Sequence, residues 1–174
     1  MADALDRLDL AVLRMLVEQP RAGVREYARQ LGVARGTVQA RLDRLQRNGV
    51  LTSYRPHISP TAMGFAGLAY VHLHLAQGML DETSVLLAQI PEILEANSIT
   101  GEGDMLCRVV AKDNADLERV VQQIIAVPGV IRSRTEVVLS RRIELRITPL
   151  IEKLATEATE ATEATEATEA GDPA

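Results

Sequence analysis

The sequence predicts an α+β protein with a small helical domain followed by a domain built on one antiparallel sheet. Apolar residues recur at helical spacing in two short segments between Arg21 and Gly49, whereas from Gly64 onward they alternate with polar residues. Strand-like and helix-like segments then follow in the order β-α-β-β-α-β, the split βαβ or ferredoxin-like arrangement. We therefore expect domains at residues 1–60 and 61–150, and a tail at residues 151–174.

Three helices are predicted in the first domain. The first spans residues 3–18, where leucines and a valine recur at helical spacing. The next two, at residues 24–31 and 35–47, are separated by Gly32, because glycine adopts a left-handed backbone at little cost. Two short amphipathic helices with a tight break between them are the sequence form of a helix-turn-helix.

Positive charge is concentrated in this helix pair. Residues 21–47 contain seven arginines and two acids, a local balance of 7 − 2 = +5 in a chain whose net charge is −5. Arginine makes bidentate contacts with guanine edges and phosphates, and nucleic-acid binding depends on the local field rather than on overall charge. The pattern favours double-stranded DNA as partner; an ordinary solvent-exposed arginine-rich helix pair is the alternative.

Residues 50–58 are rich in strand-forming residues, and Pro56 and Pro60 mark their end. We predict a strand here that serves as the wing of a winged helix-turn-helix, with Arg55 in contact with a DNA phosphate. A plain linker is the alternative.

The second domain is predicted to contain four strands and two helices. The strands are expected at residues 69–75, 93–100, 105–111 and 130–140, the helices at 82–90 and 113–126, and a further short strand is an option at 143–147. The two helices cover one face of the sheet. We expect a second copy of the chain to cover the other face, which predicts a homodimer.

The end of the chain has a different composition. Residues 155–169 are five copies of Ala-Thr-Glu, and residues 151–174 carry one lysine and seven acids. No face of the repeat is apolar, and threonine at every third position lowers helix propensity. We therefore predict a disordered acidic tail, and competition of this tail with DNA for the arginines is one function open to it.

Other functional classes find little support. No apolar run approaches the roughly 20 residues of a membrane span, and the first ten residues do not resemble a signal peptide. The single cysteine, Cys107, fits a reducing compartment, so we expect a cytoplasmic protein. Since no P-loop, catalytic triad or zinc spacing is present, we predict no catalytic residues, no metal and no cofactor.

Three segments together resemble the Lrp/AsnC (feast/famine) family of transcriptional regulators of bacteria and archaea. They are LDRLDLAVLRML at residues 5–16, LGVARGTVQARLDRLQRNGVL at residues 31–51, and TGEGDMLCRVV at residues 100–110. The resemblance extends over residues 5–150. It implies a winged helix-turn-helix, and a ferredoxin-like (RAM-type) domain that pairs into homodimers, which often assemble further into octamers.

The resemblance also implies two sets of site residues. Those expected to face the major groove and its flanking phosphates are Arg35, Gly36, Thr37, Gln39, Arg41 and Arg44. Those expected to form the effector site are Gly101, Glu102, Gly103, Asp104 and Met105. Backbone amides in this turn suit a carboxylate and Asp104 an ammonium, so the expected effector is an amino acid or a similar small molecule. An aspartate that only bonds its own backbone is the alternative for Asp104.

Two positions depart from the family pattern. Ala34 stands where family members carry Ser or Thr, so the recognition helix lacks an N-cap hydroxyl, a loss of about 1 kcal/mol. The turn lacks the family's aromatic residue beside its aspartate and has Gly103 and Met105 instead. This predicts a pocket with smaller walls.

The predicted function is sequence-specific DNA binding that an effector modulates. A two-fold dimer presents two recognition helices, which predicts a pseudo-palindromic site with half-sites about one helical turn, or a multiple of it, apart. An architectural DNA-binding protein without an effector is one alternative. A sirohaem-decarboxylase-like enzyme is another, because such enzymes resemble this architecture and His72 and His74 share one strand face; we expect both histidines, with Tyr70, on the dimer-facing side of the sheet.

Overall fold

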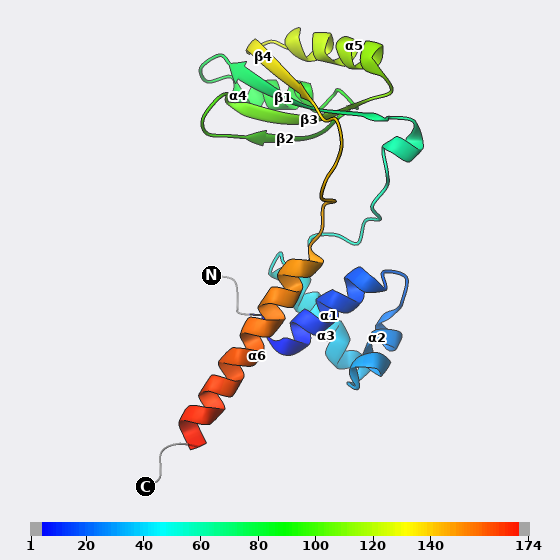
Figure 1. The fold of residues 1–174 in the computed structure, drawn as a ribbon, viewed down its shortest axis with the longest axis vertical. Helices are drawn as coiled ribbons and strands as arrows, with labels where there is room; N and C mark the ends of the chain where they lie inside the picture. The colour runs from blue at the N-terminus through cyan, green and yellow to red at the C-terminus, as the bar shows by residue number, and fades with distance from the viewer. Residues whose placement is uncertain (1–4, 171–174) are drawn as a thin grey trace. The chain divides into compact units, whose positions relative to one another are not determined.

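The structure of the chain is a computed structural model that describes residues 5–170 and, within them, the side chains of residues 5–161. The chain forms two compact units (Figure 1). The helical unit consists of the chain up to Pro56 together with the chain from Glu144 onward, and the sheet unit consists of His57–Ile143. The helical unit is thus built from two separate parts of the sequence.

The helical unit contains the three predicted helices, α1 (Arg7–Glu18), α2 (Val24–Leu31) and α3 (Arg35–Arg47). Helix α1 begins later than predicted because Asp6 caps it: the Asp6 carboxylate accepts from the amide of Asp9, and the Asp9 carboxylate accepts from the amide of Asp6. Gly32 ends α2 with φ of 67°, the left-handed backbone that the sequence predicts there. Ala34 precedes α3 and makes no side-chain cap.

Apolar side chains from all three helices form the core of this unit. The buried members are Val12, Met15, Tyr27, Ala28, Val38, Leu42 and Leu45. The hydroxyl of Tyr27 donates a hydrogen bond of 2.7 Å to the carbonyl of Gln19, so its polar end is satisfied inside the core. This packing holds the two helices of the predicted helix-turn-helix against α1.

The predicted wing is wrong. Residues 50–58 form no strand, and neither do residues 143–147, so the linker alternative holds for residues 50–58. A strand needs a neighbour that pairs with its amides and carbonyls, and Pro56 and Pro60 have no amide hydrogen to offer. Arg55 lies exposed in this linker, where its amide donates to the hydroxyl of Ser53 at 2.9 Å.

The predicted disordered tail is also at odds with the structure, because α6 (Thr148–Ala170) occupies this segment. Alanine and glutamate favour helix, and the hydroxyls of Thr156 and Thr159 bond to carbonyls one turn earlier, at 3.2 and 2.9 Å, so threonine does not break it. Ile151 is only 6% exposed, and α6 packs against α1. An apolar anchor ahead of the repeat therefore holds the helix.

The sheet unit confirms the order β-α-β-β-α-β. Its elements are β1 (Gly67–Leu75), α4 (Leu80–Leu87), β2 (Ile93–Ser98), β3 (Met105–Ala111), α5 (Asn114–Ile125) and β4 (Val130–Val137), preceded by a 3-10 turn, η1 (Thr61–Met63). The strands lie in the order β2-β3-β1-β4, and all neighbours are antiparallel. The central strand β1 therefore pairs with both β3 and β4.

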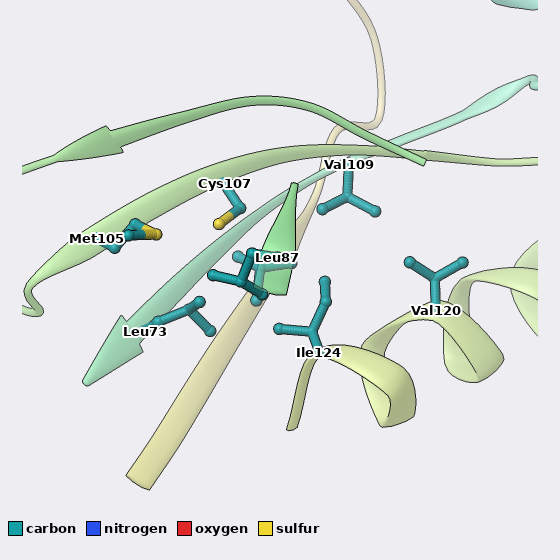
Figure 2. Close-up of a cluster of buried hydrophobic side chains, with 8 residues drawn as sticks. Leu73, Leu87, Met105, Cys107, Val109, Val120 and Ile124 are labelled. Atoms are coloured by element: carbon teal, nitrogen blue, oxygen red, sulfur yellow. The ribbon is translucent and has the colours of Figure 1, made fainter. Parts of the chain in front are cut away.

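Helices α4 and α5 cover one face of this sheet (Figure 2). Leu87, Val120 and Ile124 of the helices pack on sheet residues that include Leu73, Met105, Cys107 and Val109. Burial raises the pKa of the Cys107 thiol to about 11, so this cysteine is a small buried apolar group rather than a nucleophile. The other face carries Tyr70, His72 and His74 of β1, which is where the sequence places them within the sheet.

Candidate DNA-binding and effector-binding sites

The side of α3 opposite its buried residues carries two small residues and an arginine, with Asp43 beside them. We name four exposed residues of α3 the outward strip: Gly36, Ala40 and Arg47, which recur on this side, and Arg35, which stands at the start of the helix. A Cβ built on Gly36 would meet nothing within 4 Å, so the backbone is open to solvent there. Small residues flanked by arginines allow a helix to approach the floor of a groove while the guanidiniums reach its walls.

The other predicted residues of the first turns lie beside this strip. Thr37 is half-buried, and Gln39 is exposed with its side-chain amide donating to Asp43 Oδ1 at 2.8 Å. Arg35, Gly36, Thr37 and Gln39 thus share the first turns of α3, with Thr37 the least exposed of the four. Ala40 and Arg47 were missed by the sequence prediction, although their spacing from Gly36, four and eleven residues, indicates the same helix face.

The structure differs from the prediction for Arg41 and Arg44, which lie on the side of α3 that faces α1. Arg41 Nη1 pairs with Asp6 Oδ2 and lies 3.3 Å from Asp9 Oδ1. Arg44 Nη2 pairs with Asp9 Oδ2 and lies 3.7 Å from Asp6 Oδ2. We call these four residues the acid–arginine cluster. Any contact of Arg41 or Arg44 with DNA competes with these ion pairs.

The cluster is partly shielded from water. The side chain of Asp9 is 0% exposed, and those of Arg41 and Arg44 are 27% and 32% exposed. Burial opposes ionisation of Asp6, but the amide of Asp9 and the two guanidiniums outweigh it and lower the pKa of that carboxyl below its ordinary value. The hydrogen bond to Asp6 in turn raises the pKa of Arg41. The cluster was missed by the sequence prediction, although each pair is spaced three residues apart on its helix.

The predicted effector turn has a backbone that suits glycine. Gly101 and Gly103 have φ of 104° and 107°, and a Cβ on Gly103 would lie 3.2 Å from the carbonyl oxygen of Leu73. The carboxylate of Glu102 already has a partner, because Arg134 Nη1 donates to it at 2.5 Å. Met105 lies in the core of the sheet unit, with 3% of its surface exposed.

Asp104 joins this turn to the end of β1. Its amide donates to the carbonyl of Leu73 at 2.8 Å, and its Oδ2 accepts from the amide of Leu75 at 2.8 Å. This bond ties the turn to β1 and is not made to the backbone of Asp104's own turn, so it differs from the alternative expected from the sequence. The other carboxylate oxygen, Oδ1, accepts no hydrogen bond from the residues that the structure describes.

A pocket of about 280 Å³ lies beside Asp104. It is lined by Leu75, Ala76, Gln77, Gly78, Leu80, Ser98, Ile99 and Asp104. Of the five predicted effector residues only Asp104 reaches this wall. The remaining lining residues come from the end of β1, the β1–α4 loop, the start of α4 and the end of β2 with the residue after it, and these segments meet the turn at one end of the strands. The predicted ends of these strands already indicated that they would meet there.

Comparison with known proteins accounts for both halves of the chain. Residues 5–46 match the model of the AsnC-type helix-turn-helix domain, and residues 68–147 match that of the Lrp/AsnC ligand binding domain. The HTH-type transcriptional regulator Ptr1 of Methanocaldococcus jannaschii is 36% identical over 119 residues, which cover 68% of this chain and 80% of that protein. The chain belongs to the Lrp/AsnC family.

Solved Lrp/AsnC structures agree with the fold. E. coli AsnC superposes with a TM-score of 0.76 at 24% identity, covering 83% of this chain and 99% of its own. A feast or famine regulatory protein from M. tuberculosis, complexed with L-methionine, has a TM-score of 0.74 at 29% identity, covering 83% and 98%. The match to the ligand binding domain ends at residue 147, and α6 begins at Thr148.

This Lrp/AsnC protein is a transcriptional regulator with a helix-turn-helix domain and a ligand-binding domain. The relatives are named as regulators, not as enzymes. We call the sheet face that α4 and α5 leave uncovered, which carries Tyr70, His72 and His74, the open face. On it, His72 Nε2 lies 3.8 Å from Glu136 Oε2. Among the described residues, no three His, Cys, Asp or Glu side chains are close enough together to hold a metal ion. No helix in the described part of the chain is long and apolar enough to cross a membrane.

Proposed function

We propose that this regulator reads a specific double-stranded DNA site through the outward strip of α3, and that a small amino-acid-like effector bound beside Asp104 modulates the binding. The observation that carries the DNA half is the strip itself: Gly36 and Ala40 leave the helix backbone open between two exposed arginines. Arg35 and Arg47 make no ion pair or hydrogen bond with any described residue, so their guanidiniums are available to phosphates and guanine edges.

The start of α3 supports the same orientation. Because Ala34 provides no side-chain acceptor, the amides of Arg35 and Gly36 have no partner among the described residues. Free amides at the positive end of a helix favour an anion such as a DNA phosphate. Thr37 and Gln39 follow within one turn and are the side chains we assign to base edges, and Arg55 of the linker is assigned to a phosphate.

The effector half is carried by Asp104. Its free Oδ1 suits an ammonium group, Gln77 offers a polar amide, and Leu75, Leu80 and Ile99 provide apolar wall for a side chain. An α-amino acid presents these groups together. The M. tuberculosis relative that holds L-methionine supports this class of ligand.

We further propose that the open face of the sheet joins two copies of the chain into a homodimer, which assembles into larger rings such as octamers. Two recognition helices related by a two-fold axis require a pseudo-palindromic site. An effector changes transcription only if it binds one assembly, or one DNA-bound geometry, more tightly than another.

Fluorescence anisotropy tests the proposal. The purified protein is titrated into a labelled duplex from its own upstream region and into a scrambled duplex, each with and without each of the twenty amino acids. We expect tighter binding to the upstream duplex than to the scrambled one, and we expect one or a few amino acids to alter this binding. In the Asp104→Asn variant, the same amino acids should have no effect. Equal binding of both duplexes without any amino-acid effect would instead favour an architectural role.

A further inference from the structure

The acid–arginine cluster determines which arginines of α3 are free to bind DNA. We infer that Asp6 and Asp9 are positioning residues of the recognition helix: they hold Arg41 and Arg44 away from DNA phosphates, so that α3 binds through its outward strip alone. This inference rests on the proposed DNA-binding face. It reverses the expectation from the family resemblance that Arg41 and Arg44 are contact residues.

Each of the four carboxylate oxygens of the two acids has at least one hydrogen-bond donor. Asp6 Oδ1 accepts from the amide of Asp9, and Asp6 Oδ2 accepts from Arg41. Asp9 Oδ2 accepts from the amide of Asp6 and from Arg44, and Asp9 Oδ1 lies 3.3 Å from Arg41 Nη1. The capping box thus orients both carboxylates towards α3. The same bonds that start α1 fix two arginines of α3.

Asp9 makes this arrangement hard to open. Its side chain is 0% exposed, so it gains nothing from water if Arg44 turns towards a phosphate. A buried carboxylate that loses its partner keeps the full desolvation penalty, and a surface phosphate offers Arg44 less than a shielded ion pair does. Arg44 therefore stays with Asp9 when DNA is present.

Asp6 holds Arg41 less firmly, because the side chain of Asp6 is 47% exposed. Asp6 is thus the member of the cluster whose removal weakens the hold on an arginine without leaving a buried charge unpaired. Of the four arginines in α3, two are neutralised within the unit and two, Arg35 and Arg47, remain for DNA.

The salt dependence of DNA binding tests the first half of the inference. The logarithm of the binding constant falls against the logarithm of salt concentration by about 0.9 for each phosphate contact. Arg47→Gln should reduce this slope by about 0.9, whereas Arg41→Gln should leave it unchanged. Equal reductions in the two variants would overturn the inference. Circular dichroism melts of both variants verify that each is folded.

Asp6→Asn tests the second half. Asparagine still caps α1, but it removes the charged partner closest to Arg41 and leaves it only Asp9 Oδ1 at 3.3 Å, so Arg41 becomes more available to a phosphate. Binding should tighten roughly 5- to 10-fold at about 0.1 M salt, with a slope steeper by up to about 0.9, as one added phosphate contact requires. A purely structural role of Asp6 predicts weaker binding instead.

Glu18→Gln is the matched control, since it removes the same charge from the other end of α1, where Glu18 pairs with Arg14 at 3.0 Å. Equal gains in Asp6→Asn and Glu18→Gln would show only an effect of net charge and would overturn the inference. If the wild-type protein bound neither duplex, the proposed DNA-binding face would fail and this inference with it. Wild-type binding with a reduced slope in Arg41→Gln would overturn the inference alone.

Discussion

Asp9 is a buried acidic residue that contacts two arginines of the neighbouring helix. Its carboxylate is 0% exposed and is stabilised by Arg44, by Arg41 and by the amide of Asp6. A buried ion pair adds little stability compared with an apolar contact, but removing only one of its partners is strongly destabilising, because the other charge stays buried without a partner. The stability of the helical unit therefore depends on whether both partners are present.

Arg44→Ala is expected to lower the free energy of unfolding by about 2–4 kcal/mol, because it leaves Asp9 buried with only Arg41 and an amide as partners. Urea denaturation followed by circular dichroism measures the loss. Arg47→Ala serves as control, since Arg47 is exposed and should change stability by less than about 0.5 kcal/mol. Similar losses in both variants would contradict the assigned role of Asp9.

The pKa of Asp6 gives the cluster a pH dependence. Because its folded-state pKa lies below the ordinary value of 3.8, the stability that this group contributes is complete above that value and is lost as the pH falls through the folded-state pKa. The melting temperatures of wild type and Asp6→Asn should therefore converge below about pH 4. A difference that stays constant between pH 7 and pH 3 would rule out this source of stability.

The roles of Arg41 and Arg44 show how far residue-level prediction reaches. Helical periodicity identifies which side of α3 is buried, since Val38, Leu42 and Leu45 recur at spacings of four and three. It does not say which of the remaining sides meets α1, because that depends on the crossing of two helices. The glycine-rich turn was likewise predicted because its signal is local. The pocket wall from the β1–α4 loop was not predicted, because it depends on how segments distant in the sequence meet.

At the scale of elements, α6 departs most from expectation. The Ala-Thr-Glu repeat has no apolar stripe. Among the described residues of α6, the only large side chain that is buried is Ile151, which precedes the repeat. Composition alone therefore predicted disorder. The prediction of a strand at residues 50–58 was wrong because composition favoured a regular element there, but the described part of the chain offers no neighbouring strand to pair with it. Helices α2 and α3 were predicted correctly because Gly32 and the apolar spacing are local signals.

Deleting the chain after Ile147 is expected to destabilise the helical unit by about 1–3 kcal/mol, because the burial of Ile151 and of its contact surface on α1 is lost. Thermal and urea unfolding of the truncated chain measure the effect. A chain that ends at Glu160 keeps Ile151 and is the control. If both truncations lost the same stability, the repeat rather than the anchor would hold α6.

At the scale of the whole molecule, the open face of the sheet is the surface on which the proposed assembly depends. Tyr70 and Leu106 lie on it, and Tyr70 is 37% exposed. The helices cover only the opposite face, and a sheet of four strands with one uncovered apolar and mixed face is typical of an interface. DNA recognition by paired half-sites would follow from this contact.

If the proposed dimer forms through this face, Leu106→Glu is expected to convert it to a monomer, because a charge replaces an apolar group that the second copy would bury. Analytical ultracentrifugation measures the mass, and anisotropy compares a duplex with two half-sites to one with a single half-site. The variant should lose the preference for the paired site. Glu95→Gln, on the exposed edge strand β2, is the control; a dimeric Leu106→Glu protein would place the interface elsewhere.

The division of the helical unit between both parts of the chain has a consequence for its biosynthesis. The ribosome releases α1, α2 and α3 first, then the whole sheet unit, and only then α6. Domains generally fold in the order in which they emerge. The helix-turn-helix therefore folds early without its fourth helix, and α1 receives the cover of Ile151 only on a chain whose ligand-binding unit has already been translated.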